Sequence, residues 1–510
     1  TSQSNVTVTL DDLAETLDNE ALENLLEDLS QFCVPKKIGP CSRVSLVGKN
    51  IKSFYPELGV VLETFKDKKC YLITQSSSEL NFSFLVAQRD VNLIVERIHS
   101  LCFGGIFDAV TLGKTWQEFF DRPLSNQNQY FYEKNWWYDK SKSLAALVKG
   151  YQPKYVYNLD VVEEKIRDFK KVENISRINY ALKANYHEGI IKTLYKEGLC
   201  FDCVSFKEVE YLKSLFPDFS AGRVVFTPNF APLDEYQKAL ELGCYVTLDN
   251  LYLLEQHAAL FAGKEILIRV DPGSGKGHHP HVKTAGKNSK FGISLESLAE
   301  VKRIAKEHSI KIIGLHAHLG SGVLDASSWF HTANLLAKVA KGFKHIQFLN
   351  LGGGFGVPEN SLQQPIDFDY LNQLLNQFKQ EYPKYQLWVE PGRYLVAECG
   401  VLLMSVTQIK KKPGKIFVGV DTGMNSLIRP SLYGSYHEIV NLNRLQSENY
   451  MTVDVVGPIC ETGDVLGYDR CLSDETKEGD VILLSNAGAY GKVMSSSYNK
   501  RDSAEEVIFS

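Results

Sequence analysis

The second part of the chain repeats one local pattern, and this repetition constrains the fold more than any other feature of the sequence. After residue 150, short apolar runs end in polar or glycine-rich tips, and stretches with apolar residues at helical spacing separate them. Eight strand-then-helix units predict an α/β fold, a parallel (β/α)8 barrel over residues 151–395, whose reactive side chains gather at the C-terminal strand ends. The runs are INYALKAN (178–185), CFDCVS (200–205), VVFTPN (224–229), CYVTLDN (244–250), EILIRVDPG (265–273), IIGLHAHLG (312–320), HIQFLNLGGGFG (345–356) and QLWVEPGR (386–393).

The net charge and the distribution of cysteines exclude several classes of binding partner. The net charge of -5 and the pI near 6.2 give no basic surface for nucleic acid or an anionic membrane, and no apolar run reaches transmembrane length. Ten cysteines are scattered through 510 residues without a signal-peptide pattern, which favours reduced thiols in the cytoplasm. Cys200 and Cys203 form a CxxC pair, but no second pair completes a zinc site, so no metal is expected. A small-molecule substrate is favoured.

Four of the eight tips supply groups that can do chemistry. Because a barrel brings its strand ends to one mouth, these groups should converge. Glycines between a strand and a helix let backbone N–H groups approach a phosphate, and an arginine can complete the grip. The residues are Lys183 from the first tip, His316, His318, Gly320 and Ser321 from the sixth, Gly352, Gly353 and Gly354 from the seventh, and Glu390, Gly392 and Arg393 from the eighth.

Pyridoxal phosphate needs these groups together. A lysine forms a Schiff base with it, a phosphate cradle anchors it, and a carboxylate opposite the pyridine nitrogen keeps that nitrogen protonated. Lys183 and Glu390 suit the first and last roles, and His318 is placed to stack on the ring. His316 is expected to be a hydrogen-bonded core histidine, because neighbouring strand positions point to opposite faces.

The same segments resemble a known family. YALKAN, HAHLGSGV, LNLGGGFG and VEPGR look like the barrel of the fold-type III pyridoxal phosphate decarboxylases, which share the barrel of alanine racemase. Three later segments resemble the C-terminal β-domain of diaminopimelate decarboxylases, here expected over residues 396–510: DTGMNSLIRPSLYGSYHE (421–438), VVGPICETGDVL (455–466) and NAGAYGKVMSSSYN (486–499). The resemblance covers about residues 150 to 510.

Roles follow from this resemblance position by position. Lys183 would be the Schiff-base lysine, His318 would stack on the ring and Glu390 would face the pyridine nitrogen. Cys460 would act at the active site of the other subunit of a homodimer. FDCVSFKEVE (201–210) departs from the glycine-rich SGGE common in such enzymes, so a role for Asp202 is only weakly implied. The remaining implied residues are Ser321, Gly352, Gly353, Gly354, Gly392 and Arg393 around the phosphate or substrate, Tyr490 over the cofactor, Glu461 for the distal ammonium, and Arg429 with Tyr433 for the distal carboxylate.

The implied reaction is decarboxylation of meso-2,6-diaminopimelate to L-lysine, and its charges suit these residues. A guanidinium binds a carboxylate bidentately, so Arg429 with Tyr433 one turn on favours a substrate with an extra carboxylate, although such a pair can also be structural. Cys460 can return a proton to Cα if its thiol is desolvated, whereas a lone cysteine elsewhere is more often core packing. Ornithine and arginine lack the far carboxylate, and carboxynorspermidine is a nearer rival.

The first 104 residues form a different region. A strand-then-helix pattern at NVTVTL (5–10) recurs at LNFSFLV (80–86), and strands and a helix between them predict a small α+β repeat. TSQSNVTVTLD, VSLVGKNI and ITQSSSELNFSFLV resemble the paired ACT regulatory domains of lysine-sensitive aspartokinases, with the first unit incomplete. The resemblance implies a lysine effector and a bifunctional aspartokinase and decarboxylase; a module that only dimerises is the alternative. Residues 105–150, rich in aromatics, are expected to be a connector.

Two alternatives from other classes remain. A barrel that only carries pyridoxal phosphate would not need the CETGD and SLIRPSLY segments, which would build a pocket for the far end of a substrate. A lysine-sensing fragment with a decayed barrel would not need to keep Lys183, His318, Glu390 and Cys460.

Overall fold

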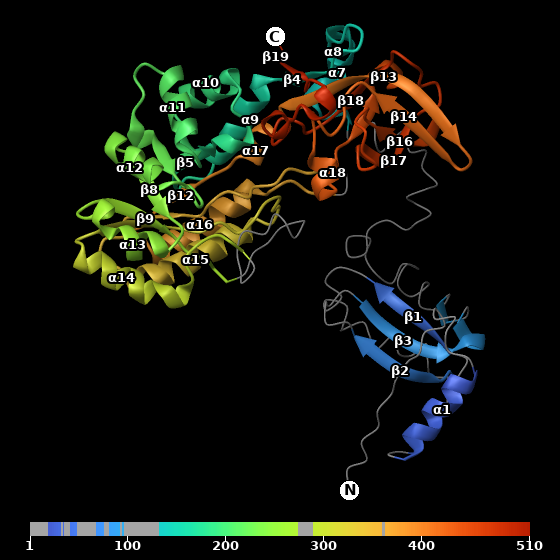
Figure 1. Ribbon diagram of the computed structural model, residues 1–510, viewed down its shortest axis with the longest axis horizontal. Coiled ribbons are helices and arrows are strands. Elements are labelled where there is room, and N and C mark those ends of the chain that lie inside the picture. Colours follow the sequence, from blue (N-terminus) through green and yellow to red (C-terminus); the bar gives the residue numbers. More distant parts are fainter. Residues whose placement is uncertain are drawn as a thin grey trace. The chain divides into compact units, whose positions relative to one another are not determined.

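The computed structural model describes residues 19–31, 34, 41–47, 68–75, 81–91, 94–95, 132–273, 289–359 and 363–509 (Figure 1). The chain divides into two compact units, residues 1–124 and residues 125–510. No helix in the described ranges is both long and apolar enough to cross a membrane.

The first unit contains a three-stranded antiparallel sheet in the order β1-β3-β2. The strands are β1 (Cys41–Val47), β2 (Cys70–Gln75) and β3 (Asn81–Ala87), and helix α1 spans Asn19–Ser30. Phe82, Phe84 and Val86 alternate along β3 and are buried, as expected for a strand with one covered face. All three strands fall on segments that the sequence predicts to be extended, RVSLVG (43–48), CYLITQSS (70–77) and LNFSFLV (80–86). The predicted strand at 5–10 lies outside the described residues, and so does the predicted helix PELGVVLETFKDKK (56–69) up to residue 67.

The second unit contains a closed barrel of eight parallel strands, which confirms the predicted fold (Figure 1). Each strand lies within one of the eight apolar runs or begins up to three residues before it. The strands are β5 (Ile175–Ala181), β6 (Cys200–Cys203), β7 (Val224–Phe226), β8 (Tyr245–Leu248), β9 (Glu265–Arg269), β10 (Lys311–His316), β11 (Phe348–Asn350) and β12 (Gln386–Val389).

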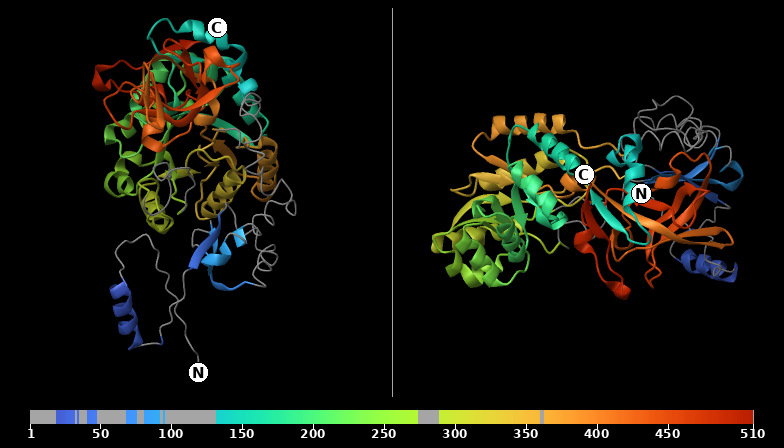
Figure 2. Two further views of the ribbon diagram at one scale, coloured as in Figure 1. Left: turned by 90° about the vertical axis from the view of Figure 1, so that its right-hand side faces the viewer. Right: turned by 90° about the horizontal axis from the view of Figure 1, so that it is seen from above.

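Amphipathic helices surround this barrel, as the views in Figure 2 show in green to yellow and orange. Helix α9 (Leu159–Lys170) illustrates the local cause: Asn158 caps it by accepting from the Asp160 backbone N–H at 3.0 Å, and its buried residues recur every three or four positions. The other helices are α10 (Glu188–Lys196), α11 (Phe206–Leu215), α12 (Leu233–Leu242), α13 (Tyr252–Phe261), α14 (Leu298–Glu307), α15 (Ser327–Ala340), α16 (Phe368–Glu381) and the short α17 (Arg393–Val396).

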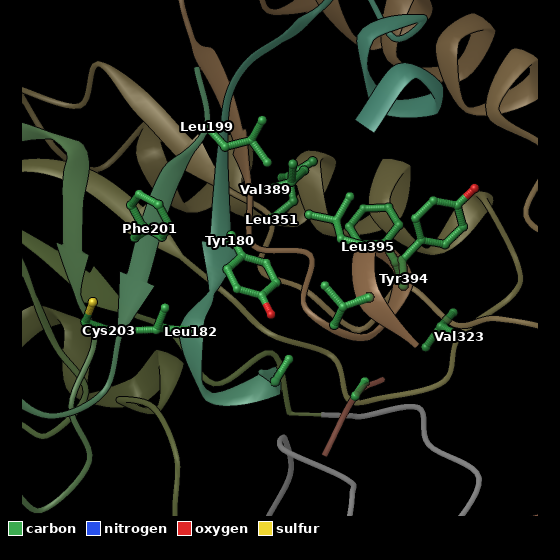
Figure 3. Packing of buried hydrophobic residues seen from close by; sticks show 14 of the residues in the cluster. Tyr180, Leu182, Leu199, Phe201, Cys203, Val323, Leu351, Val389, Tyr394 and Leu395 are labelled. Carbon is green, nitrogen blue, oxygen red and sulfur yellow. The ribbon is translucent and has the colours of Figure 1, made fainter. Parts of the chain in front are cut away.

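Side chains fill the barrel on both sides of its strands. Inside, the rings of Phe348 and Trp388 stack at 3.7 Å, and the Arg177 guanidinium lies 4.5 Å from the Trp388 ring. Gly314 makes this possible, because a Cβ there would lie 2.2 Å from the Phe348 ring. Figure 3 shows part of the core around β5, β6 and α17, with Tyr180, Leu182, Phe201, Cys203, Tyr394 and Leu395.

A second sheet, drawn in orange and red in Figure 1, forms the C-terminal β-domain. Its order is β15-β18-β13-β14-β16-β17, and β4 joins it by pairing with β13 and β19. Strand β4 therefore belongs to this sheet, although the predicted barrel begins at residue 151. The strands are β4 (Lys154–Tyr157), β13 (Gly400–Lys412), β14 (Lys415–Val420), β15 (Ile439–Asn441), β16 (Tyr450–Val456), β17 (Val465–Ser473), β18 (Val481–Leu484) and β19 (Glu505–Ile508).

The described part of the connector packs on the β-domain. Helices α7 (Trp136–Asp139) and α8 (Ser141–Leu147) place Trp137 and Leu144 in a buried cluster with residues of β4, β13 and β18. The Trp136 indole donates to the Glu398 carbonyl at 3.0 Å, and the Tyr132 hydroxyl donates to Glu438 at 3.0 Å. These aromatic side chains attach the chain to the β-domain before the barrel begins.

Candidate active site

Lys183 lies at the barrel mouth and is paired with Asp202. It follows β5 in a short 3-10 turn, and its Nζ is 3.0 Å from Asp202 Oδ2 at the end of β6. The Lys183 side chain is 43% exposed toward the mouth, whereas that of Asp202 is 1% exposed. Burial lowers the pKa of Lys183, but the Asp202 carboxylate together with Tyr490 and Glu390 raises it, and the net shift is upward, so the amine is held as a cation. Asp202, only weakly implied by the sequence, is the direct partner of this lysine.

Glu390 is the centre of a buried hydrogen-bonded group. Its Oε2 lies 3.0 Å from His316 Nε2, and its Oε1 accepts from Asn350 Nδ2 at 2.6 Å. Burial raises the pKa of Glu390, but the contact with His316 and the charge of the nearby Lys183 lower it, and the net shift is downward, so the carboxylate stays ionised.

His316 is a buried and hydrogen-bonded histidine, as predicted, but its partner is a residue of the predicted cofactor site. His316 ends β10 and fixes the Glu390 carboxylate from the neighbouring part of the barrel.

His318 is held by the glycine loop of the seventh unit. Its Nδ1 accepts from the Gly353 backbone N–H at 3.0 Å, which leaves any ring proton on Nε2. Burial, and then the positive charges of Arg269 and Lys183, keep its pKa well below the ordinary value. His318 is therefore a neutral ring at neutral pH, with its flat faces free of a formal charge.

Each glycine of that loop is required by a close approach of the backbone. A Cβ on Gly352 would lie 2.5 Å from the Ala317 carbonyl oxygen, one on Gly353 would lie 2.2 Å from the Glu390 carbonyl oxygen, and one on Gly354 would lie 2.5 Å from the Gly320 carbonyl oxygen. The loop therefore fits between the tips of β10 and β12 only without side chains.

Arg393 and Tyr490 close the mouth on the side of the β-domain. Arg393 is 8% exposed, and its Nη2 donates to Ser321 Oγ at 3.1 Å. Its buried Nε has no hydrogen-bond partner among the residues that the structure describes. The Tyr490 ring lies 5.0 Å from the guanidinium, and its backbone N–H donates to the Ala184 carbonyl at 2.8 Å. A Cβ on Gly392 would touch Ala184 Cβ at 3.1 Å and the Tyr490 hydroxyl at 3.3 Å.

Arg429 is a buried cation beside this group. It begins helix α18 (Arg429–Tyr433) and is 2% exposed. Its Nη1 donates to His437 Nε2 at 3.0 Å and its Nη2 donates to Ser435 Oγ at 3.2 Å, both neutral acceptors. Burial lowers the pKa of Arg429, and the charge of the nearby Arg393 lowers it further, whereas Glu359 and, to a smaller extent, Tyr490 and Tyr433 raise it.

Cys460 and Glu461 lie on the surface of the β-domain. Both are exposed, in the segment between β16 and β17. The Cys460 backbone N–H donates to Asn499 Oδ1 at 2.7 Å, and Glu461 accepts from the Tyr498 hydroxyl at 2.8 Å. The structure therefore brings Lys183, His318 and Glu390 together in the barrel and leaves this pair on a separate surface.

Sequence reasoning did not select three further buried groups at the mouth. Asn350 ends β11 beside Glu390, and Arg269 ends β9 with its guanidinium 4.5 Å from the Phe291 ring. Asp249 follows β8, is 4% exposed and accepts from Asn229. A signal for them was present, because each is a polar residue at the end of a predicted strand, the position used to select Lys183.

The mouth has the groups that pyridoxal phosphate requires. Lys183 is partly exposed and can react with an aldehyde, Arg393 Nε is a buried donor with no partner in the described ranges and can bind a phosphate, and Glu390 is an ionised carboxylate. The glycine loop leaves backbone in place of side chains around this space. Among the described residues, no group of three metal-ligating side chains is present.

Comparison with known proteins agrees with this geometry. Residues 159–397 match the family model of the pyridoxal-dependent decarboxylase, pyridoxal binding domain. A diaminopimelate decarboxylase from Methanothermobacter thermautotrophicus is 37% identical over 65% of this chain and 79% of that protein. A second, from Archaeoglobus fulgidus, is 35% identical over 70% of this chain and 88% of that protein.

Solved structures give the same result. The crystal structure of diaminopimelate decarboxylase from Helicobacter pylori, complexed with L-lysine, superposes with a TM-score of 0.66 and 31% identity. The match covers 72% of this chain and 94% of that one. With its barrel, its cofactor mouth and these relatives, the chain belongs to the diaminopimelate decarboxylase family of pyridoxal phosphate-dependent enzymes.

Proposed function

We propose that this chain removes CO2 from meso-2,6-diaminopimelate to give L-lysine, with pyridoxal phosphate as cofactor. The observation that supports this substrate best is Arg429, a buried guanidinium beside the mouth whose two hydrogen bonds go to neutral partners. A cation held in this way is a site for a carboxylate. Diaminopimelate keeps a carboxylate at its far end after the near one is lost, whereas ornithine and arginine have none there.

The barrel residues would hold the cofactor. Lys183 would bind it covalently, and Asp202 would keep the displaced amine charged and near the mouth. His318 would lie against the ring as a neutral plane, and Glu390 would hold the pyridine nitrogen protonated, with His316 and Asn350 fixing the carboxylate. The phosphate would lie among Ser321, the backbone of Gly352, Gly353, Gly354 and Gly392, and Arg393.

When bound, the cofactor takes up the electron pair that the breaking bond to CO2 leaves on Cα. Arg429 and Tyr433 would orient the far carboxylate, and Arg393 and Tyr490 would enclose the reacting end from water. Cα must then gain one proton, which the Cys460 thiol would donate and recover from solvent. Glu461 would bind the distal ammonium.

Cys460 and Glu461 are exposed, so these two roles require the mouth of a second copy of the chain. We therefore include a homodimer with shared active sites in the proposal. Such an interface would be isologous and would complete two mouths at once. Analytical ultracentrifugation of the purified chain tests it, and an active monomer would contradict it.

The proposed substrate is tested by the product of the purified chain with added pyridoxal phosphate. We expect lysine from meso-diaminopimelate and little turnover of ornithine, arginine or carboxynorspermidine. Arg429→Met should raise the KM for diaminopimelate by about 100-fold, since a charge-assisted bidentate contact is lost. Preferred turnover of one of the other three amino acids would overturn the substrate and leave the cofactor site standing.

We also propose that the first unit is an ACT-type regulatory region and that the natural protein includes an aspartokinase. The antiparallel order β1-β3-β2, on the predicted strand segments, supports this. Lysine would be the effector. Calorimetry with the Arg429→Met variant separates it from product binding: lysine that still binds with one site per chain supports an effector site, and loss of all binding opposes it. A transcript without an upstream kinase reading frame would oppose the fusion.

We place the protein in the cytoplasm, where diaminopimelate and reduced thiols occur together. The described cysteines form no disulfide with one another, which agrees with a reducing compartment. Fractionation of cells with an antibody to the chain tests this location.

A further inference from the structure

His437 is the residue that holds Arg429, and its ring proton is fixed by the fold. It is fully buried, and its Nδ1 lies 2.8 Å from the Ser485 carbonyl oxygen. A carbonyl can only accept, so Nδ1 bears the hydrogen and donates it. Nε2 therefore has a free lone pair, and it accepts from Arg429 Nη1 at 3.0 Å. One imidazole thus links the guanidinium to the backbone after β18.

The link is rigid because the backbone is tied at the same point. The Ser485 N–H donates to the Glu438 carbonyl at 2.9 Å, one residue beyond His437. Two bonds in opposite directions therefore join the segment before β15 to the residue after β18. The position of the guanidinium is set by this pair of elements and by Ser435 on its other nitrogen.

The partners of Arg429 orient its charge without cancelling it. His437 and Ser435 are neutral. Glu359 forms an ion pair with Arg429, with Oε1 3.8 Å from Nη2, too far for a hydrogen bond, so it offsets the charge only in part and leaves the hydrogen-bonding positions to neutral groups. A carboxylate in the place of the imidazole would form an ion pair with Arg429 and compete with the substrate. A second cation in that place would repel the Arg429 guanidinium.

We propose that His437 is a positioning residue for substrate selection: as a neutral acceptor it aims the Arg429 guanidinium at the far carboxylate of the substrate and adds no charge of its own that would compete with that carboxylate. This deepens the proposed function and rests on Arg429 binding that carboxylate. Burial and the charge of Arg429 both lower the pKa of His437, which agrees with a ring that stays neutral in this contact.

A pair of inhibitors that differ by one carboxylate tests the proposal. L-Lysine keeps the far carboxylate of diaminopimelate, and cadaverine lacks it. Their inhibition constants are measured for the wild-type enzyme and for His437→Ala, His437→Gln and His437→Glu. Because His437→Ala loses a hydrogen bond to a charged group, we expect the inhibition constant of lysine to rise about tenfold in this variant. In His437→Gln, which still offers an acceptor, the constant should rise less than about threefold. The inhibition constant of cadaverine should change less than about twofold in all three variants.

The glutamate and glutamine variants separate orientation from charge. Both supply an oxygen acceptor of similar reach, but only glutamate neutralises Arg429. We expect His437→Glu to raise the inhibition constant of lysine at least about tenfold, as in the alanine variant. Equal lysine constants for the glutamate and glutamine variants would overturn the proposal, and this comparison stands even if His437→Ala does not fold.

Asn441→Ala is the matched control. Asn441 is a buried polar residue on β15 whose amide donates to Thr476 and Asp480 and not to Arg429. It should lower stability and leave the ratio of lysine to cadaverine inhibition unchanged. A changed ratio in this control would reduce His437 to a structural residue. Failure of the wild-type enzyme to convert diaminopimelate would instead overturn the proposed function.

Discussion

The barrel mouth and the surface segment of the β-domain supply different halves of the proposed site. In the barrel, Lys183 and Glu390 are joined to partners within the same chain, at 3.0 Å to Asp202 and to His316. In the β-domain, Cys460 and Glu461 are exposed and contact Asn499 and Tyr498 next to them. One chain therefore brings its proposed cofactor residues together by itself, whereas under our proposal the proton donor comes from a second chain.

The largest effect is expected in the barrel. Lys183→Ala should abolish the absorbance of covalently bound pyridoxal phosphate and lower kcat on the order of 10³-fold or more, because the covalent contact is lost. Lys415→Ala is the control, since Lys415 is a surface lysine ion-paired with Asp454 and Asp469 at 2.9 Å. It should keep full activity. An active Lys183→Ala enzyme would contradict the proposal that the barrel mouth binds the cofactor through Lys183.

The β-domain half should show a smaller loss that a second chain can repair. Cys460→Ala should lower kcat roughly 10²- to 10⁴-fold with little change in the unfolding free energy, because the side chain is exposed and is the proposed proton donor. Mixed with Lys183→Ala chains, unfolded and refolded together, it should regain about a quarter of the wild-type activity, since half of the dimers would have one intact site.

That mixing experiment also decides where Cys460 acts. If each chain used its own cysteine, every site in a mixed dimer would lack either the lysine or the thiol. The mixture would then stay inactive, and the division between barrel and β-domain would fail.

A third test compares two glycines of the two regions. Gly353→Ala should lower the unfolding free energy by about 1–3 kcal/mol, because its Cβ would lie 2.2 Å from the Glu390 carbonyl oxygen. Gly463→Ala, where no atom lies within 4 Å of the new Cβ, should change it by less than about 0.5 kcal/mol. Urea unfolding measures both, and similar losses would show that the glycine loop is not packed as tightly as its contacts indicate.

The smallest expected effect is a pH dependence of stability. Burial holds the pKa values of His318 in the barrel and His437 in the β-domain below the unfolded value of about 6.5. Below pH 6.5 these two histidines bind protons in the unfolded chain but stay neutral in the folded chain. The free energy of unfolding therefore keeps its full value above this pH and decreases below it. Each histidine should lower the free energy of unfolding by about 1 kcal/mol between pH 6.5 and pH 5.5.

His437→Gln should remove its share of that loss. The measurement is the urea midpoint at both pH values for the wild-type and variant enzymes. Equal pH dependence in the two would show that His437 takes up its proton while folded.

The barrel could be predicted because its information is local. Each strand lies in a short apolar run and each helix has buried residues at helical spacing, and their alternation leaves few topologies. The groups at the mouth followed from one rule, that side chains after parallel strands share one end. Lys183, His318, the glycine loop and Glu390 were selected in this way, whereas Cys460, Glu461, Arg429 and Tyr433 came from the family resemblance.

The pairing of these groups was not in the sequence. Lys183 and Asp202 are 19 residues apart, and His316 and Glu390 are 74 residues apart, so their contacts exist only after the barrel closes. The membership of β4 in the C-terminal sheet has the same origin, since its pairing with β13 depends on residues far along the chain.

By itself, the sequence determined the eight strand-and-helix units, the residue types at their tips and the glycines that allow close backbone contact, because these depend on neighbours along the chain. Only the tertiary structure decided which charges meet, that His437 and Ser435 give Arg429 neutral partners, and that Cys460 lies outside. The physical reason is that burial and hydrogen bonding between distant residues set protonation and charge, and neither exists before the chain folds.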